Sequence, residues 1–263
     1  LDPHSFPTRR SSDLFGTTDR TYNNAVDLCK KLGTDFREIN IVDSCLQHFK
    51  DIGHPAEIHD VTYENVQARE RTQILMDLAN KEAALLVGTG DLSEIALGWA
   101  TYNGDHMSMY SVNCSIPKTL VRYLVKFSAE HNSEKDISDI LIDILDTPVS
   151  PELLPKDKDG KIAQKTEDIV GPYELHDFFL YYFMRQNATF EKILYLAKEA
   201  FKDDYDEETI KKWLDKFMRR FFTQQFKRSA IPDGPKVGTI SLSPRGDLKM
   251  PSDASYNIWV ENK

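Results

Sequence analysis

One short stretch restricts the fold of this chain more than any other. An apolar run at residues 83–87 ends at the turn Gly88-Thr89-Gly90, which leads into a further apolar stretch. The run is short, does not alternate with polar residues and ends at glycine, which predicts a buried strand. Asp91 and Glu94 then stand three residues apart, the spacing of a helix capping box with Asp in place of Ser or Thr. The stretch therefore predicts a strand, a tight turn and a helix in succession.

Such a turn leaves backbone N–H groups free at the carboxyl end of a strand, where open α/β sheets bind ligands and where helix N-termini favour phosphate. Taken alone, a turn of this kind is more often a plain connection than a nucleotide site. Glu94, one turn into the helix, would repel a bare phosphate unless a divalent cation lay between them. The pattern favours a phosphate-and-cation site, with a structural turn as the alternative.

Helical and strand patterns alternate in the first half of the chain, and helical patterns alone follow in the second. Helices are predicted at residues 21–32, 43–52, 62–81, 118–129 and 133–145, and a strand at 36–42. Ser133 is the predicted cap of the fifth helix, and residues 148–169 form a charged, turn-rich segment. Further helices are predicted at residues 172–186, 189–201 and 207–225, before a tail that wraps the surface. We therefore predict an α/β fold with a parallel sheet flanked by helices and a helical C-terminal region.

Composition excludes several classes of protein. The chain of 263 residues has 40% hydrophobic and 29% charged residues, as expected for a globular protein. A net charge of −9 argues against a nucleic-acid surface, and no apolar run reaches the roughly 18 residues of a membrane span. Three scattered cysteines, Cys29, Cys45 and Cys114, indicate free thiols and a cytoplasmic location.

Residues 1–14 differ from the rest of the chain. Residues 6–14 match what one reading frame of a common sequencing-adapter oligonucleotide would encode, and the segment lacks the apolar core of a signal peptide. We expect a non-native leader here, with a genuine disordered leader as the alternative, and set it apart from fold reasoning.

Two basic positions are candidates for binding an anion. Asn65 and Arg69 stand four residues apart on one face of a predicted helix, where the guanidinium could hold a phosphate or carboxylate; a solvated i,i+4 ion pair is the alternative. Lys118 follows Pro117 at a helix start, where the helix dipole disfavours a cation unless the cation faces an anion; simple exposure is the alternative.

Other side chains give weaker signals. Cys45 and His48 share a helical face, but no second pair has metal spacing, which argues against a zinc site. His106, beside Asp105, is a weak candidate for acid/base chemistry. The sequence contains no Walker A loop, no Gly-x-Ser-x-Gly elbow and no Rossmann glycine fingerprint.

Taken together, three stretches resemble one family. They are residues 63–71 (YENVQARER), residues 86–99 (LVGTGDLSEIALGW), and residues 102–105 (YNGD) followed by 117–121 (PKTLV). Their order and spacing resemble NAD synthetases, in particular the synthetase part of the bacterial glutamine-dependent enzyme. The resemblance runs from about Phe15 to Val237. It implies an adenine nucleotide alpha hydrolase-like fold of the ATP-pyrophosphatase type, with a domain over 15–237 that is incomplete at its N-terminus and a tail over 238–263.

The resemblance also implies a reaction. The family adenylates the nicotinate carboxylate of deamido-NAD with ATP and Mg2+, and ammonia then attacks the acyl adenylate to give NAD, AMP and pyrophosphate. The implied partners are deamido-NAD, ATP and ammonia, or glutamine through a separate glutaminase domain. A homo-oligomer in the cytoplasm is expected, with no nucleic-acid or membrane partner.

The implied site residues follow from matching positions, and no catalytic side chain is among them. The ATP contacts are Thr89, Lys118 and Thr166, the magnesium ligand is Glu94, and the deamido-NAD contacts are Asn65, Arg69, Glu94, Trp99, Ala100, Thr101, Tyr102 and Lys227. Thr166 lies in the charged segment, which resembles the family's mobile cover and would exclude water from a hydrolysable adenylate.

The chain also departs from the family pattern. Tyr102 and Met109 stand where some ammonia-dependent members have lysine and aspartate, so contacts to the nicotinate ribose differ there. The family's pyrophosphate loop, Ser-Gly-Gly-x-Asp-Ser, and the glutaminase domain are expected upstream of Phe15, so we expect this polypeptide alone to be inactive or nearly so.

Two alternative functions remain open. One is another ATP-pyrophosphatase amidotransferase such as a GMP synthetase, against which Arg69 and the run from Trp99 to Tyr102 argue. The other is a non-catalytic nucleotide-binding or assembly module.

Overall fold

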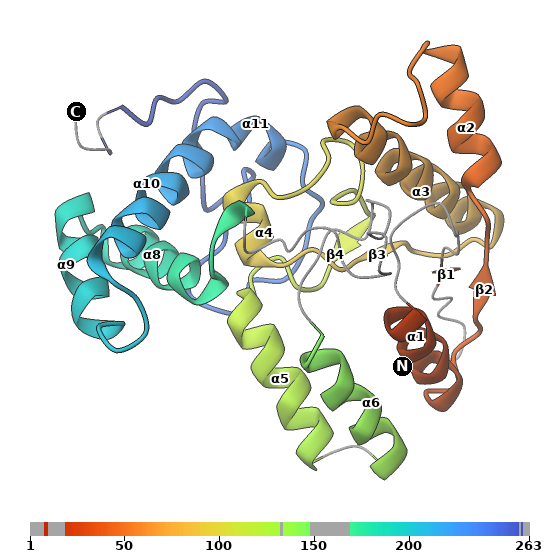
Figure 1. Cartoon of the computed structure of the whole chain (residues 1–263), viewed down its shortest axis with the longest axis horizontal. Coiled ribbons are helices and arrows are strands. Elements are labelled where there is room, and N and C mark those ends of the chain that lie inside the picture. The colour runs from red at the N-terminus through yellow and green to blue at the C-terminus, as the bar shows by residue number, and fades with distance from the viewer. Residues whose placement is uncertain (1–7, 10–18, 132–133, 148–168, 258, 260–263) are drawn as a thin grey trace. The chain divides into compact units, whose positions relative to one another are not determined.

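The computed structural model describes residues 8–9, 19–131, 134–147, 169–257 and 259. The chain divides into two compact units, Leu1–Ala84 with Arg122–Thr166, and Leu85–Val121 with Glu167–Lys263. Figure 1 labels the elements of both units. Within the described residues, no helix has both the length and the apolar character needed to cross a membrane.

The first unit contains two short strands and a set of helices. Its elements are β1 (Thr8–Arg9), α1 (Asp19–Lys31), β2 (Arg37–Glu38), α2 (Val42–Asp51), α3 (Val61–Lys81), the part of α5 (Lys118–His131) from Arg122 onward, and α6 (Lys135–Leu145). β1 and β2 pair in parallel, with Thr8 opposite Arg37. This pair includes two residues of the segment that we set apart from fold reasoning.

Local signals explain the helices of the first unit. The Asp60 carboxylate caps α3 by accepting from the backbone N–H groups of Thr62 and Tyr63. Gly33 and Gly53 follow α1 and α2 with φ of +66° and +68°, the left-handed conformation that ends a helix at glycine. The helices predicted at 21–32, 43–52 and 62–81 are confirmed to within two residues at each end. The strand predicted at 36–42 is shorter in the structure: β2 covers only Arg37–Glu38, and Val42 already belongs to α2.

Among its described residues, the first unit has an apolar cluster and a polar seam, which is a row of hydrogen bonds and ion pairs between two helices. The cluster consists of Ile41, Cys45, Phe49, Tyr63 and Val66, all buried between α2 and α3. The seam joins α1 to α6, where the Asp143 carboxylate accepts from Arg20 at 2.6 Å and from Asn24 at 2.5 Å, and Lys31 pairs with Asp136 at 2.5 Å.

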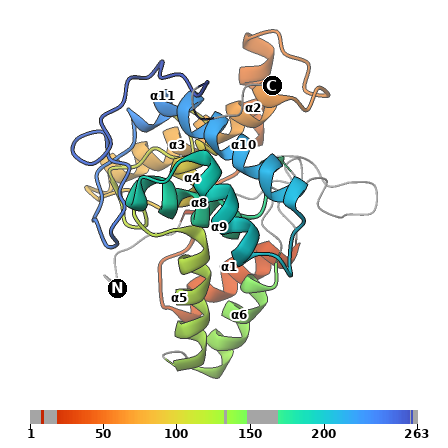
Figure 2. The ribbon, with the colours of Figure 1, turned by 90° about the vertical axis from the view of Figure 1, so that its left-hand side faces the viewer.

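The second unit has a parallel strand pair followed by a helical layer. Its elements are β3 (Val87–Gly88), α4 (Leu92–Leu97), β4 (Tyr110–Ser111), residues 118–121 of α5, α8 (Tyr173–Gln186), α9 (Phe190–Ala200), α10 (Glu207–Thr223) and α11 (Gln225–Arg228). β3 and β4 pair in parallel, with Val87 opposite Tyr110. Figure 2 shows α8, α9 and α10 side by side. The α/β class, the parallel pairing and the helical C-terminal region are therefore confirmed.

The tail after α11 has no helix or strand among its described residues and lies against the second unit. Asp233 accepts from the backbone N–H of Ser111, and Pro235 accepts from the Ser115 hydroxyl. Leu242 is fully buried. The prediction that the tail wraps the surface is confirmed for its described part.

Two details of the sequence prediction need correction. The run at 83–87 is not a buried strand, since Leu85 is 61% exposed and Val87 46% exposed. These side chains alternate with Leu86 and Gly88, so one face of the short strand is open although the sequence shows an unbroken apolar run.

The second correction concerns the start of α6. Ser133, the predicted cap, lies outside the described residues, and Glu134 holds the N-cap position of α6. The charged segment at 148–168 also lies outside them.

The core of the second unit encloses a histidine. His176 of α8 is 2% exposed, and its ring lies near the aromatic rings of Phe179, Trp213 and Phe217. Its Nε2 atom lies 2.5 Å from the Val170 carbonyl, which requires a proton on Nε2, while Nδ1 is buried without a partner. Burial lowers the pKa of His176 to about 4.

We predict that His176 makes this protein less stable in mild acid. Unfolding restores the ordinary pKa of about 6.5, so below that pH the unfolded chain takes up a proton that the folded chain refuses. Between pH 7.5 and 5 this linkage should lower the free energy of unfolding by about 2 kcal/mol. Urea titrations of the unaltered chain and of His176→Gln at both pH values test this. The free energy of unfolding of the variant should lack the pH-dependent decrease that His176 contributes. An equal pH dependence in the two proteins would contradict it.

Candidate functional site

The turn between β3 and α4 is held by local contacts that the sequence specifies. Asp91 caps α4 by accepting from the backbone N–H of Glu94 at 2.9 Å, and the Glu94 carboxylate accepts from the backbone N–H of Asp91 at 3.3 Å. The predicted capping box is therefore confirmed. Gly88 is needed for close packing, since a Cβ there would come within 2.3 Å of the Ser108 hydroxyl.

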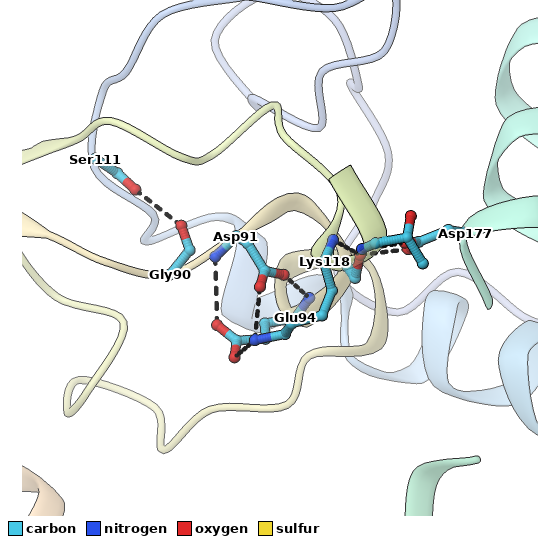
Figure 3. Close-up of polar contacts among 8 residues, drawn as sticks. Gly90, Asp91, Glu94, Ser111, Lys118 and Asp177 are labelled. Atoms are coloured by element: carbon cyan, nitrogen blue, oxygen red, sulfur yellow. Dashed lines mark hydrogen bonds and ion pairs between the residues drawn. The ribbon is translucent and has the colours of Figure 1, made fainter. Parts of the chain in front are cut away.

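A cation lies between two carboxylates at the start of α4. The Lys118 ammonium lies 2.7 Å from Asp91 Oδ2 and 2.6 Å from Glu94 Oε1. Figure 3 draws these three side chains and their contacts. The Asp91 side chain is only 4% exposed. Lys118 thus faces anions at a helix start, as the dipole argument requires, and is not simply exposed.

The close charges in this cluster change its titration. Burial and the neighbouring Asp91 carboxylate raise the pKa of Glu94 to about 6, although Lys118 opposes the change. Burial alone would lower the pKa of Lys118, but Glu94 and Asp91 outweigh it, so the pKa is raised. The cluster therefore favours the charged form of Lys118, while Glu94 takes up a proton more readily than an ordinary glutamate.

A second carboxylate network supports the cluster from α8. Asp177 accepts from the Ser93 hydroxyl through one oxygen, and from the Thr119 backbone N–H at 3.0 Å and hydroxyl at 2.6 Å through the other. The Ser93 hydroxyl in turn accepts from the Lys118 backbone N–H at 2.8 Å. The first two N–H groups of α5 are thus satisfied by side chains of α4 and α8.

Three basic side chains meet the carboxyl end of α4. Arg220 donates to the Leu97 carbonyl at 2.8 Å, Lys227 donates to the Gly98 carbonyl at 2.9 Å, and Arg228 donates to the Ala96 carbonyl at 2.9 Å. These carbonyls lie at the end of a helix, where they lack intrahelical partners and where the helix dipole favours cations. α10 and α11 therefore complete the hydrogen bonding of α4.

The loop after α4 carries half of the predicted deamido-NAD contacts, Trp99 to Tyr102. Lys227 reaches it by donating to the Ala100 carbonyl at 2.6 Å, and the Arg220 guanidinium lies 5.3 Å from the centre of the Trp99 ring. The Thr101 backbone N–H donates to Asp105 at 2.6 Å, and Tyr102 is 39% exposed. The structure thus brings Lys227 together with the run from Trp99 to Tyr102.

The other predicted site residues lie elsewhere. Thr89 is exposed in the turn before α4. Asn65 and Arg69 belong to α3 of the first unit, where Arg69 is exposed and Asn65 is partly buried. Thr166 is outside the described residues. His106 contacts the Thr101 carbonyl through Nδ1 at 2.9 Å, and burial lowers the pKa of its ring.

Four residues of this region were missed by sequence reasoning: Ser93, Asp177, Arg220 and Arg228. Ser93 and Asp177 hold the start of α5, and the two arginines hold the end of α4. The only sequence signal for the arginines is their place at the ends of α10 and α11, where basic residues favour the dipole of their own helix.

The donors at the start of α4 are compatible with a magnesium ion. Asp91 and Glu94 supply carboxylate oxygens, the ligands that Mg2+ prefers, and the Lys118 ammonium lies between them as a cation would. In the part of the chain that the structure describes, no group of three or more His, Cys, Asp or Glu side chains is placed to hold a metal ion. Mg2+ is commonly held by one or two carboxylates together with substrate phosphates, and this donor set fits that mode.

Comparison with known proteins identifies the family. The model of the NAD synthase family matches residues 15–227, so this chain belongs to that family. The glutamine-dependent NAD(+) synthetase of Mycobacterium leprae is 44% identical over 94% of this chain and 40% of its own length. The corresponding enzyme of Mycobacterium tuberculosis is 42% identical, with the same coverage. The chain therefore spans about 40% of the length of these relatives.

A solved structure supports the fold. The crystal structure of a glutamine-dependent NAD(+) synthetase from Cytophaga hutchinsonii superposes with a TM-score of 0.75, and the match covers 95% of this chain and 39% of that protein at 21% identity. At this identity the likeness establishes the fold alone.

Proposed function

We propose that this chain carries the synthetase site of an ATP-dependent NAD synthetase. The site would adenylate deamido-NAD and amidate it to NAD, releasing AMP and pyrophosphate, with nitrogen from glutamine or ammonia. The observation that carries the proposal is the cluster of Asp91, Glu94 and Lys118 at a helix N-terminus directly after a parallel strand. Because the relatives are longer, the proposal concerns the site and not the activity of this chain by itself.

Each residue of the cluster has a chemical role in this proposal. Lys118 would bind an ATP phosphate, and Thr89 in the adjoining turn is exposed where it could contact the same nucleotide. Glu94 would hold Mg2+, which neutralises the charge that develops on the leaving pyrophosphate. Binding of the nucleotide would then draw the Lys118 ammonium from the carboxylates toward phosphate. Thr166 remains a proposed ATP contact.

The loop after α4 is the proposed binding site of deamido-NAD. Trp99, Ala100, Thr101 and Tyr102 present an aromatic and polar surface, and Lys227 is fixed to the loop through two carbonyls. Burial and the nearby Arg220 guanidinium lower the pKa of Lys227. Lys227 is therefore proposed to shape the loop and to present a positive charge to the substrate. Asn65 and Arg69 are proposed to contact the same substrate.

A chimera tests the proposal directly. Residues 15–227 would replace the matching part of the Mycobacterium leprae enzyme, which supplies the remaining length of the protein. We expect NAD formation from deamido-NAD that depends on ATP and Mg2+, and no product from xanthosine monophosphate. Product from xanthosine monophosphate would instead indicate a GMP synthetase, and nucleotide binding without any product would indicate a binding module.

We also propose a homo-oligomer. Tyr123, Leu124 and Phe127 form an exposed apolar stripe on α5 at helical spacing. We expect sedimentation velocity to show a dimer or larger assembly, and Leu124→Glu to shift it toward monomer because a charge in the interface is costly to desolvate. Exposed Lys126→Glu on the same helix is the matched control. An unaltered chain that sediments as a monomer would contradict the proposal.

We also propose a cellular location for the protein and boundaries for the segments of its chain. A reducing cytoplasm is supported by Cys29, Cys45 and Cys114, all of which are free thiols. The leader at 1–14, the domain at 15–237 and the tail at 238–263 are proposed boundaries. N-terminal sequencing of the natural protein tests the first of them.

A further inference from the structure

Asp177 occupies an unusual place in the second unit. It lies on α8, 84 residues from Ser93 and 58 residues from Thr119, yet it binds the starts of both α4 and α5. Its three hydrogen bonds use both carboxylate oxygens. Burial raises the pKa of Asp177, and the bonds from Ser93 and Thr119 oppose this by stabilising the charged form.

The contacts of Asp177 lead directly to the candidate site. Ser93 donates its hydroxyl proton to Asp177 and accepts the Lys118 backbone N–H on the same oxygen. Lys118 and Thr119, the first two residues of α5, are thus both fixed at the backbone. The Lys118 side chain then extends to Asp91 and Glu94 (Figure 3). The position of the ammonium is consequently set by the start of α5.

A local cap does not explain this arrangement. The first turn of α5 contains no acidic residue, and Pro117, before it, cannot act as a side-chain cap. The orphan N–H groups of the helix start are satisfied instead by Ser93 and Asp177. Any movement of α8 against α4 would therefore move Lys118 relative to Glu94.

We propose that Asp177 is a positioning residue that fixes the Lys118 ammonium between Asp91 and Glu94 by clamping the start of α5 to α4. It acts through Ser93 and Thr119 and touches no substrate. That this position of Lys118 serves ATP binding rests on the proposed function. The positioning of Lys118 by Asp177 does not depend on it.

Reactivity of the Lys118 amine in the full chain tests the proposal. Trace acetic anhydride acetylates unprotonated amines, and mass spectrometry compares Lys118 with exposed Lys202 in the same sample. We expect Asp177→Asn, Ser93→Ala and Thr119→Val each to raise the Lys118 rate at pH 8 by about twofold to tenfold, the equivalent of one lost hydrogen bond. The pH midpoint of Lys118 labelling should fall in each variant.

The variants separate positioning from other effects. Ser93→Ala and Thr119→Val keep the Asp177 charge, so a change confined to Asp177→Asn would show a through-space charge effect and overturn the proposal. Unchanged Lys118 labelling in all three would overturn it too. A loss of thermal stability alone does not change the labelling of Lys118 relative to Lys202 in the native state. If Asp177→Asn fails to fold, the Lys118 labelling rates of Ser93→Ala and Thr119→Val decide whether the clamp positions Lys118. Glu174→Gln, an exposed change on the same helix, is the control and should have no effect.

Added magnesium-ATP distinguishes the two proposals. In the chimera with the unaltered residues 15–227, protection of Lys118 by magnesium-ATP supports the nucleotide site, and absence of protection counts against the proposed function. The comparison of variants without nucleotide still decides whether Asp177 positions Lys118.

Discussion

Replacing Glu94 with glutamine is expected to reduce NAD formation by the chimera by about 100-fold to 1,000-fold, the usual cost of removing one electrostatic group at a reacting centre. Glutamine keeps the size of the side chain and can still accept from the Asp91 backbone N–H, as a capping box requires. The variant therefore removes the charge that would hold Mg2+ and keeps the local fold. The rate of NAD formation at saturating deamido-NAD measures the loss.

A matched control separates charge at the site from charge in general. Glu208→Gln removes a carboxylate from the first turn of α10, where the side chain is exposed. The rate of NAD formation by this variant should stay within about a factor of two of the rate of the unaltered chimera. This range corresponds to the roughly ±0.5 kcal/mol by which surface substitutions usually change a free energy. Full activity of Glu94→Gln would remove Glu94 from the proposed site. A fall in both variants would point to a general effect of charge.

Replacing Arg228 with methionine is expected to lower the free energy of unfolding by about 3 kcal/mol. Arg228 is 1% exposed, and its guanidinium donates to the carbonyls of Ile95, Ala96 and Phe221 and to the Gln225 side chain. Methionine fills part of the space but removes a donor from each of these acceptors, although the Ile95 carbonyl keeps another donor, the Gly98 backbone N–H. Each buried acceptor left without a donor costs about 1–3 kcal/mol before relaxation. Part of this loss is offset, because folding of the variant no longer removes a charged guanidinium from water. The cost of that desolvation is visible in the pKa of Arg228, which burial lowers to about 9.

Tryptophan fluorescence during urea unfolding measures this change. All three tryptophans, Trp99, Trp213 and Trp259, belong to the second unit, so the signal reports on the unit that contains Arg228. Arg185→Met, an exposed change at the end of α8, is the control and should shift stability by no more than about 0.5 kcal/mol. Equal stability of Arg228→Met and Arg185→Met would show that α4 does not depend on the buried guanidinium.

The parts of the site that the sequence predicts are local in the chain. Asp91 and Glu94 are three residues apart, so their capping box follows from helix geometry alone. Lys118 could be expected to face an anion because of its place at a helix start, and the resemblance supplied its assignment to ATP. The α/β class followed from alternating patterns.

The parts that the sequence does not predict depend on distant contacts. Asp177 reaches Ser93 across 84 residues, and Arg228 reaches Ala96 across 132. A helical pattern shows which face is apolar but not which neighbour a polar side chain will meet. The same limit explains the error at Leu85 and Val87, since an apolar run does not reveal whether a second layer covers both faces of a strand.

Exchange of labelled pyrophosphate into ATP by the chimera tests the central claim most directly, because it reports formation of the acyl adenylate without the amidation step. We expect exchange that requires both Mg2+ and deamido-NAD, and that is lost in Glu94→Gln. Exchange supported by xanthosine monophosphate, or no exchange with deamido-NAD in a folded chimera, would contradict it.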